Sequence, residues 1–227
     1  MAVIHQTTLK PTKLELLASW LPSRTWYQGG SGEPRLVKAG GFRLDDPHGE
    51  VGVEFIVVAD TGGTHPVAYL VPFTYRGAPL EGADHALVGT MEHGVLGRRW
   101  VYDGCHDPVP VAQLLALIEG RVQAQDQNTS DTPDREVTRS FTGDGPAPAD
   151  FVVGATTDDQ DGTELSAAQG AILRVHRVLR PGTDSRSPLP QGTTGHVGGS
   201  WQLPDGTRAR GLFATLRTAP GIDAGAR

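Results

Sequence analysis

The chain has 227 residues, a formal net charge of −6 at pH 7 and 37% hydrophobic residues, with 30 glycines and 17 prolines. The acidic balance argues against a general nucleic-acid-binding protein, and this length allows one large domain or two small ones. The single cysteine, Cys105, excludes an intrachain disulfide, and no apolar run is long enough to span a membrane. Because the N-terminal segment has no signal-peptide pattern, we expect a cytoplasmic protein.

The first 120 residues predict an α+β domain with a curved antiparallel sheet and helices packed against it. Turn-forming stretches rich in Asp, Gly and Pro separate short apolar segments, which is typical of an antiparallel meander. Helices are expected at 11–21, where apolar residues recur at helical spacing, and at 108–120, after an N-cap at Asp107. The expected strands are 2–9, 36–44, 51–59, 67–75 and 87–90.

The apolar spacing of the first helix predicts one buried side. Leu14, Leu17 and Leu21 lie on that side, so the helix must pack against the sheet. We expect these leucines to contact alternating residues that share one face of a strand: Val53, Phe55 and Val57.

Residues 121–134 are polar and almost free of apolar side chains, which predicts a linker or long loop. Residues 135–218 predict a small, mostly-β domain, and 219–227 a flexible tail. The last two strands of this part form a hairpin through Pro204-Asp205-Gly206. The expected strands are 137–142, 151–157, 171–179, 195–203 and 208–216.

Several stretches of the first half share one family pattern and occur in the family's order. They resemble the N-terminal cap of the maltokinases, which use ATP to phosphorylate maltose in bacterial trehalose and α-glucan metabolism. In that family the cap precedes a two-lobed kinase of the aminoglycoside-phosphotransferase type. The stretches are AVIHQTTLKPTKLELLASWLP at 2–22, GEVGVEF at 49–55, VPFTYRGAPLEGAD at 71–84 and EHGVLGRRWVYDGCHDPV at 92–109.

The second half resembles the same kinases over a shorter stretch. AILRVHRVLRPG at 171–182 is similar to the central strand of the kinase N-lobe, where a lysine pairs with the nucleotide phosphates. The matching position is Arg174, which keeps the charge but differs from lysine in shape and reach. The resemblance therefore implies a degenerate N-lobe with Arg174 as a degenerate nucleotide-phosphate position.

The sequence lacks the motifs of a catalytic kinase lobe. No His-x-Asp with a suitably spaced Asn, and no metal-binding motif like Asp-Phe-Gly, follows the N-lobe-like strand. We therefore expect no catalytic residues and no cofactor, and favour a non-catalytic accessory protein that acts by binding a sugar, a nucleotide, or a partner enzyme of α-glucan or trehalose metabolism. The alternative is a split sugar kinase, in which a separate chain supplies the catalytic lobe and ATP and Mg²⁺ are required.

Polar and aromatic side chains beside glycines give the candidate ligand or partner surface. They fall in two segments, 74–80 and 93–103, and aromatic rings with guanidinium groups can hold sugars or a partner protein. The other interpretation is that these side chains only hold the domain together through packing and hydrogen bonds. The candidates are Tyr75, Arg76, Arg98, Arg99, Trp100 and Tyr102.

Two stretches contain metal-ligating residue types. The spacing of His93, Cys105, His106 and Asp107 matches no standard zinc pattern. The run DDQDG at 158–162 lacks the downstream glutamate of a calcium-binding loop. We expect turns at both places and no metal site.

Overall fold

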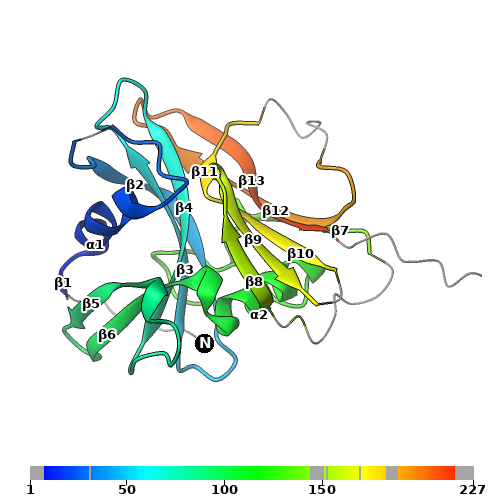
Figure 1. Ribbon diagram of the computed structural model, residues 1–227, viewed down its shortest axis with the longest axis horizontal. Helices are drawn as coiled ribbons and strands as arrows, with labels where there is room; N and C mark the ends of the chain where they lie inside the picture. Colours follow the sequence, from blue (N-terminus) through cyan, green and yellow to red (C-terminus); the bar gives the residue numbers. More distant parts are fainter. Residues whose placement is uncertain are drawn as a thin grey trace, which may run out of the picture.

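The computed structural model describes residues 8–30, 32–143, 151, 153–168, 170–182 and 189–217 (Figure 1). It contains two α-helices, α1 (Lys13–Trp20) and α2 (Pro108–Glu119), and three short 3₁₀ turns, η1 (Leu21–Ser23), η2 (Asp84–Ala86) and η3 (Gly104–His106). All strand pairs are antiparallel, so the predicted antiparallel sheet with packed helices is confirmed. The kinase N-lobe resemblance stays a prediction.

The strands have the following bounds. They are β1 (Leu9–Lys10), β2 (Leu36–Leu44), β3 (Gly52–Asp60), β4 (Val67–Arg76), β5 (Leu87–His93), β6 (Gly97–Asp103), β7 (Thr138–Phe141), β8 (Val153–Asp158), β9 (Gly162–Ala167), β10 (Ile172–His176), β11 (Val178–Leu179), β12 (Thr193–Gln202) and β13 (Arg208–Arg217). Most of the predicted first strand and the whole predicted tail lie outside the described residues.

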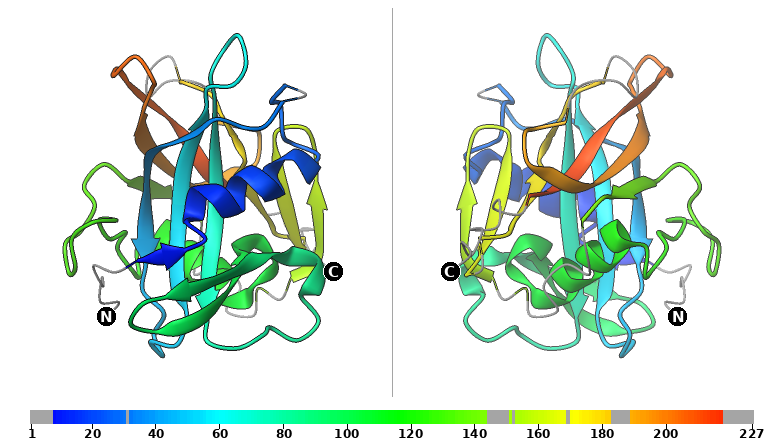
Figure 2. Two further views of the ribbon diagram at one scale, coloured as in Figure 1. Left: turned by 90° about the vertical axis from the view of Figure 1, so that its left-hand side faces the viewer. Right: turned by 90° about the vertical axis from the view of Figure 1, so that its right-hand side faces the viewer.

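The sheet returns on itself to form a closed ring of strands. Hydrogen-bonded neighbours follow the order β1-β5-β6-β4-β3-β2-β12-β13-β10-β9-β8. β11 follows β10 after a single residue, Arg177, and pairs with β4. The path from β4 through β3, β2, β12, β13 and β10 therefore leads back to β4, and strands from both halves of the chain surround one core (Figure 2).

Helix α1 covers the outside of this ring, whereas α2 packs against its interior. Leu17 and Leu21 are fully buried, as expected. They belong to the outer cluster with Ile56 and Val58, and α1 lies across the outer side of β3 and β4 (Figure 2). The prediction that these leucines contact Val53, Phe55 and Val57 is wrong, because those three residues face inward, towards α2.

The error has a simple physical cause. Side chains alternate between the two faces of a strand, so a shift of one residue moves the whole set to the other face. Every residue of β3 after Gly52 is buried, and both faces are apolar except at Glu54 and Asp60. The sequence pattern therefore shows that β3 is covered on both sides but not which side meets α1.

Side-chain caps define where both helices begin. Thr12 and Glu15 form a reciprocal capping box at the start of α1. Asp107 caps α2, as predicted, by accepting a hydrogen bond from the Val109 amide at 3.0 Å. α2 ends at Gly120, whose φ of 81° lies in the left-handed region that favours glycine.

Two strands do not appear in the sequence-based prediction. β6 falls in the segment read as a surface loop, because consecutive arginines beside a glycine do not resemble a strand. β9 follows directly after the DDQDG turn and alternates buried and half-buried residues only from Thr163 onward. Residues 121–134 contain no helix or named strand, as a long loop should, although Gln125 forms bridges to Arg43 and Pro133.

Neither helix in the described part of the chain combines the length and the apolar character needed to cross a membrane.

Candidate partner surface

The structure brings the two predicted surface segments side by side. β6 pairs with β5 along its length and with the end of β4, so that Arg76 lies opposite Trp100 and Thr74 opposite Tyr102. The β5–β6 hairpin lies on the side of the molecule away from the second half (Figure 1). The candidate residues therefore lie close together, but their side chains serve different purposes.

Arg76 anchors the start of α2. Its Nε and Nη2 donate to the two carboxylate oxygens of Asp107 at 2.6 and 2.7 Å. Asp107 has a fully buried side chain, and the hydrogen bonds between the two groups raise the pKa of Arg76. A bidentate pair at a helix N-terminus neutralises the capping carboxylate and fixes the helix to the sheet.

Tyr75 belongs to a buried polar cluster on the outer side of the sheet. Its hydroxyl donates to Glu54 at 2.6 Å, and Lys13 forms an ion pair with the same carboxylate oxygen. Burial alone would raise the pKa of Glu54, but Lys13 and Tyr75 outweigh it and hold that pKa below its usual value. Burial, followed by the Glu54 charge, raises the pKa of Tyr75 well above its ordinary value.

Trp100 and Tyr102 fix the loop that follows β4. Tyr102 is buried, and its hydroxyl oxygen accepts a hydrogen bond from the Leu80 amide at 2.9 Å. Trp100 is half-buried and packs with Ala83 and Ala86 in the same small apolar cluster. Most of the surface of both aromatic side chains is therefore covered by other residues of the chain.

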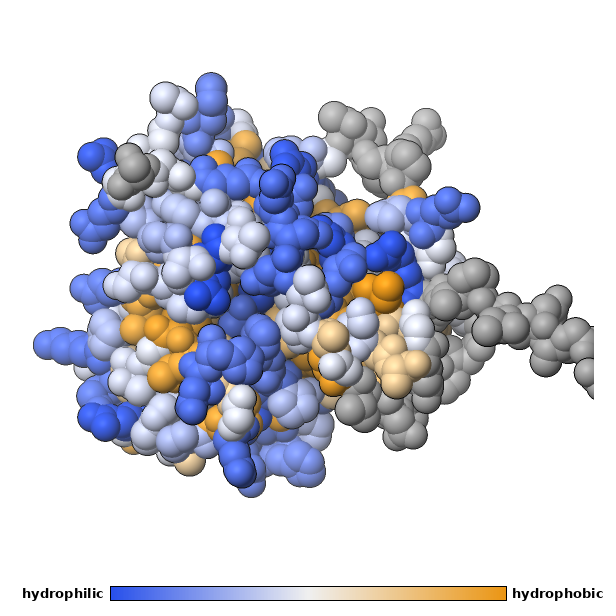
Figure 3. Space-filling model, in the orientation of Figure 1, coloured by the Kyte–Doolittle hydropathy of each residue, from blue (hydrophilic) through white to orange (hydrophobic). Residues whose placement is uncertain are grey.

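The tip of the β5–β6 hairpin is the part that faces outward. Arg98 pairs with Glu92 at 3.1 Å, with both side chains more than half exposed. Val95 and Leu96, between the two strands, are 60% and 47% exposed. The face of the molecule in Figure 3 is mostly hydrophilic with small separate apolar patches. Val95 and Leu96 are two adjacent members of the exposed large hydrophobic residues, which also include Val37 and Leu189.

Arg99 lies at the end of this tip and supports its turn. Its Nη2 donates to the Leu96 carbonyl at 3.0 Å, and its Nε is buried without a hydrogen-bond partner among the described residues. We define the hairpin tip as residues 94–99, since these positions combine the exposed aliphatic pair with two arginines.

Arg174 lies far from this hairpin, on β10, and is held by acidic side chains. Its Nη1 and Nη2 donate to the two oxygens of Asp159 at 2.6 and 2.9 Å, and Nη1 also lies 3.2 Å from Glu164. These hydrogen bonds lower the pKa of Asp159 to about 2. The guanidinium group is therefore engaged by two carboxylates of its own half.

Arg177 is a structural residue that the sequence-based prediction missed. It is fully buried, and its Nη2 lies 2.7 and 2.6 Å from the two carboxylate oxygens of Asp103. Its Nε donates to Thr163 at 2.8 Å, and the guanidinium lies 5.1 Å from the ring centroid of Trp26. This side chain joins the two halves of the ring.

The sequence did contain a signal for this role. Leu173 and Val175 are the buried residues of β10, and a period of two continues that face to Arg177. A charged residue at a core position requires a buried partner, so the pattern indicates a buried ion pair. It does not show that Asp103 is the partner.

The metal-ligating residue types noted in the sequence point to different neighbours. His93 accepts hydrogen bonds from the Val95 and Leu96 amides, Cys105 is buried, and Asp107 holds Arg76. Burial is also the main reason that the pKa of the Cys105 thiol is raised. Within the described residues, no group of three or more His, Cys, Asp or Glu side chains is placed to hold a metal ion.

The carboxylates of the acidic turn at 158–162 also have partners within the protein. Asp159 pairs with Arg174, Asp161 pairs with Arg180, and Asp158 accepts a hydrogen bond from Thr163. These carboxylates serve as partners for basic and hydroxyl groups of the second half.

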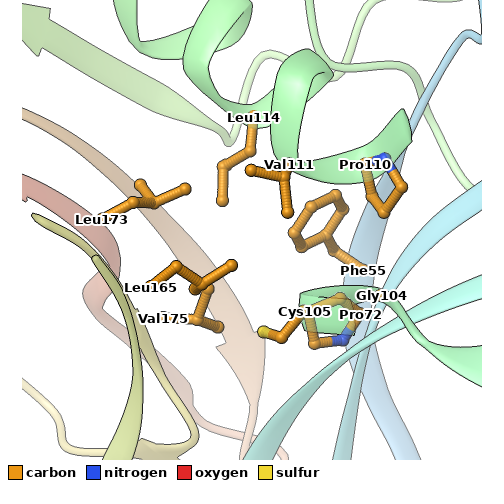
Figure 4. Close-up of a pocket in the computed structure, with 10 residues that line it drawn as sticks. All are labelled: Phe55, Pro72, Gly104, Cys105, Pro110, Val111, Leu114, Leu165, Leu173 and Val175. Atoms are coloured by element: carbon orange, nitrogen blue, oxygen red, sulfur yellow. The ribbon is translucent and has the colours of Figure 1, made fainter. Parts of the chain in front are cut away.

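A small hollow lies between α2, η3 and the inner side of β9 and β10 (Figure 4). Its cavity volume is about 10 Å³, roughly the space that one water molecule requires. Such a water would lack polar partners, because the lining is almost wholly apolar, so we interpret the hollow as a packing gap. The lining residues are Phe55, Pro72, Gly104, Cys105, Pro110, Val111, Leu114, Leu165, Leu173 and Val175.

Comparison with known proteins gives a family match within the first half. The family model of the maltokinase N-terminal cap domain matches residues 20–107. This range runs from the end of α1 to the N-cap of α2 and confirms the cap resemblance predicted for this part of the chain. β7 to β13 lie outside the match, and the search of curated proteins found no match to the chain.

Proposed function

We propose that the chain is a non-catalytic accessory protein of carbohydrate metabolism that acts by binding a partner enzyme of maltose, trehalose or α-glucan conversion. The metabolic link rests on the match of residues 20–107 to the maltokinase cap domain. The non-catalytic role rests on one observation, the ion pairing of Arg174.

Arg174 occupies the position that resembles the phosphate-pairing lysine of the kinase N-lobe. Both of its terminal nitrogens donate to Asp159, and Glu164 lies beside them. A nucleotide phosphate at this position would have to displace a bidentate carboxylate and would meet a second negative charge. This arrangement favours a structural role for Arg174 over nucleotide binding.

The hairpin tip is the surface through which we propose that the partner binds. Exposed Val95 and Leu96 supply apolar area, and Arg98 supplies a charge at the rim. Interfaces between proteins typically combine an apolar centre with a polar rim, and arginine is enriched in them. Arg76, Tyr75 and Tyr102 then act behind the tip, as supports for the strands and the loop.

An assay of phosphoryl transfer tests the proposed lack of catalysis. The purified chain is incubated with ATP, Mg²⁺ and a panel of sugars that includes maltose and glucosamine, and ADP and sugar phosphate are measured. We expect no turnover above the protein-free background. Turnover that disappears in Arg174→Ala, while Arg180→Ala retains it, would overturn the proposal.

Site-specific crosslinking tests the binding role. A photoreactive amino acid is placed at Val95 and, as a control, at Val37, which is also exposed but lies on β2. In the native host, we expect position 95 alone to crosslink an enzyme that acts on maltose, trehalose or an α-glucan. Capture of a separate kinase lobe that phosphorylates sugar only when mixed with this chain would instead establish the split kinase.

A further inference from the structure

Two histidines that are far apart in the sequence meet near the start of α2. His85 lies in η2 and His106 in η3, and His85 Nε2 is 3.2 Å from His106 Nδ1. The ring planes are almost perpendicular, at 89°, with centroids 4.8 Å apart. His85 is exposed and His106 is half-buried, so solvent reaches one side of the pair.

We propose that His85 and His106 together form a binding site for one divalent transition-metal ion of the Cu²⁺ or Zn²⁺ class. No such role follows from the cap resemblance, and this inference does not depend on the proposed function. Two imidazole ligands are fewer than a structural zinc site has, so the ion would complete its coordination with water.

The distance between the two nitrogens suits shared coordination. Imidazole nitrogens bind zinc at about 2.0–2.1 Å, and two of them at a tetrahedral angle are therefore roughly 3.3 Å apart. The observed separation of 3.2 Å is close to this value. The ion would lie off the line between the two nitrogens, so each ring would have to turn until its lone pair points at the ion. The ring that donates the hydrogen bond would then carry its proton on its other nitrogen, while η2 and η3 stay in place.

A bound ion would join two segments that the backbone leaves separate. η2 belongs to the loop after β4, and η3 leads into Asp107 and α2. The ion would therefore fix this loop to the start of α2, beside the pair between Arg76 and Asp107. We expect metal at about 100 times its dissociation constant to raise the melting temperature by roughly 5–10 °C.

The test uses tag-free protein that has been treated with a chelator, because a polyhistidine tag would bind the same ions. Cu²⁺ and Zn²⁺ are titrated by calorimetry into the unmodified chain, His85→Ala, His106→Ala and the control His65→Ala, an exposed histidine elsewhere. We expect one ion per chain. Each site variant should bind about tenfold or more weakly, and the control should bind normally.

Electron paramagnetic resonance of the Cu²⁺ complex gives a second, independent result. We expect nitrogen couplings from two imidazoles in the unmodified chain and from one in His85→Ala, whose exposed side chain can be removed without disturbing the core. Circular dichroism without metal checks that the variants fold. Affinity in both site variants that is unchanged from the unmodified chain, or binding lost in the His65→Ala control, overturns the proposed site.

Discussion

The two halves of the ring cover the outer faces of their strands in different ways. Outside β3 and β4, the covering layer is mostly apolar and comes from α1 and η1, with Leu17, Trp20 and Leu21 buried there. Outside β9 and β10, the covering layer consists of ion pairs, in which Glu164 accepts from both Arg174 and Arg217. The inner faces of both halves belong to the same apolar core.

This difference explains the environment of Arg174. β10 alternates buried and half-buried residues, and Arg174 lies on its half-buried outer face, where carboxylate partners balance its charge. β3 and β4 bury nearly every residue because both of their faces are covered. The second half therefore contributes one apolar face to a core that the first half (the cap half, residues up to 120) completes.

The buried pair between Arg177 and Asp103 connects the two halves, and breaking it should have the largest effect. Arg177→Ala leaves the Asp103 carboxylate buried without its cation, and we expect a loss of about 3–5 kcal/mol in the free energy of unfolding. Urea denaturation measures this loss. The double variant Arg177→Met, Asp103→Asn should recover part of it. A loss below about 1 kcal/mol in the single variant would contradict this role.

Removing the apolar cover of the cap half should have the next largest effect. Leu17→Ala deletes a fully buried side chain between α1 and the sheet, and we expect a loss of about 3 kcal/mol. The matched control, Ser19→Ala, changes an exposed residue of the same helix and should change stability by less than about 0.5 kcal/mol. Equal losses in the two variants would show that the helix is not held by this contact.

Arg76→Ala separates a structural role from a binding role at the candidate surface. It removes both hydrogen bonds to the buried Asp107 carboxylate, so we expect a loss of about 2 kcal/mol, measured by urea denaturation. Thermal melting and crosslinking from position 95 are then compared. Unchanged melting with lost crosslinking would mean that Arg76 contacts the partner directly.

The second half should show its own dependence on pH through His176. Burial lowers the pKa of His176 to about 4, so between pH 6.5 and 4 the unfolded chain binds this proton more readily than the folded chain. Stability should therefore fall as the pH drops through this range, by on the order of 3 kcal/mol. His176→Gln should flatten that part of the profile, measured as the urea midpoint at each pH.

The exposed pair at the hairpin tip should have the smallest effect on stability. Arg98→Ala removes an ion pair whose side chains are 62% and 61% exposed, and we expect a loss below about 0.5 kcal/mol that shrinks further in high salt. Crosslinking of the partner from position 95 should weaken in the same variant. A large, salt-insensitive loss of stability would place Arg98 among the structural residues instead.

The sequence predicted the continuous apolar strands and the helix ends better than the surface elements. β2 was predicted at its observed bounds, and Asp107 was identified as the cap of α2, because both depend on local patterns. β6 was missed, because its first residues are charged and its pairing with β4 connects distant segments. The side on which α1 packs also depends on tertiary contacts, since β3 is apolar on both faces.

The same distinction applies to the candidate site. Residue types indicated a polar, aromatic surface at 74–80 and 93–103, and the structure places these segments together. Sequence alone could not show that Arg76 is paired with Asp107 or that His85 meets His106, because each contact joins residues that are far apart in the chain. The exposure of Val95 likewise follows from the hairpin geometry.

Because residues of both halves form one apolar core inside the ring, we expect the whole chain to unfold as one unit. Fluorine NMR of the chain labelled with 5-fluorotryptophan tests this directly, because Trp20, Trp26 and Trp100 report on the cap half and Trp201 on the second half. During a urea titration, we predict that all four native signals disappear at the same urea concentration. Loss of the Trp201 signal at a clearly different concentration from those of Trp20 and Trp26 would contradict the claim.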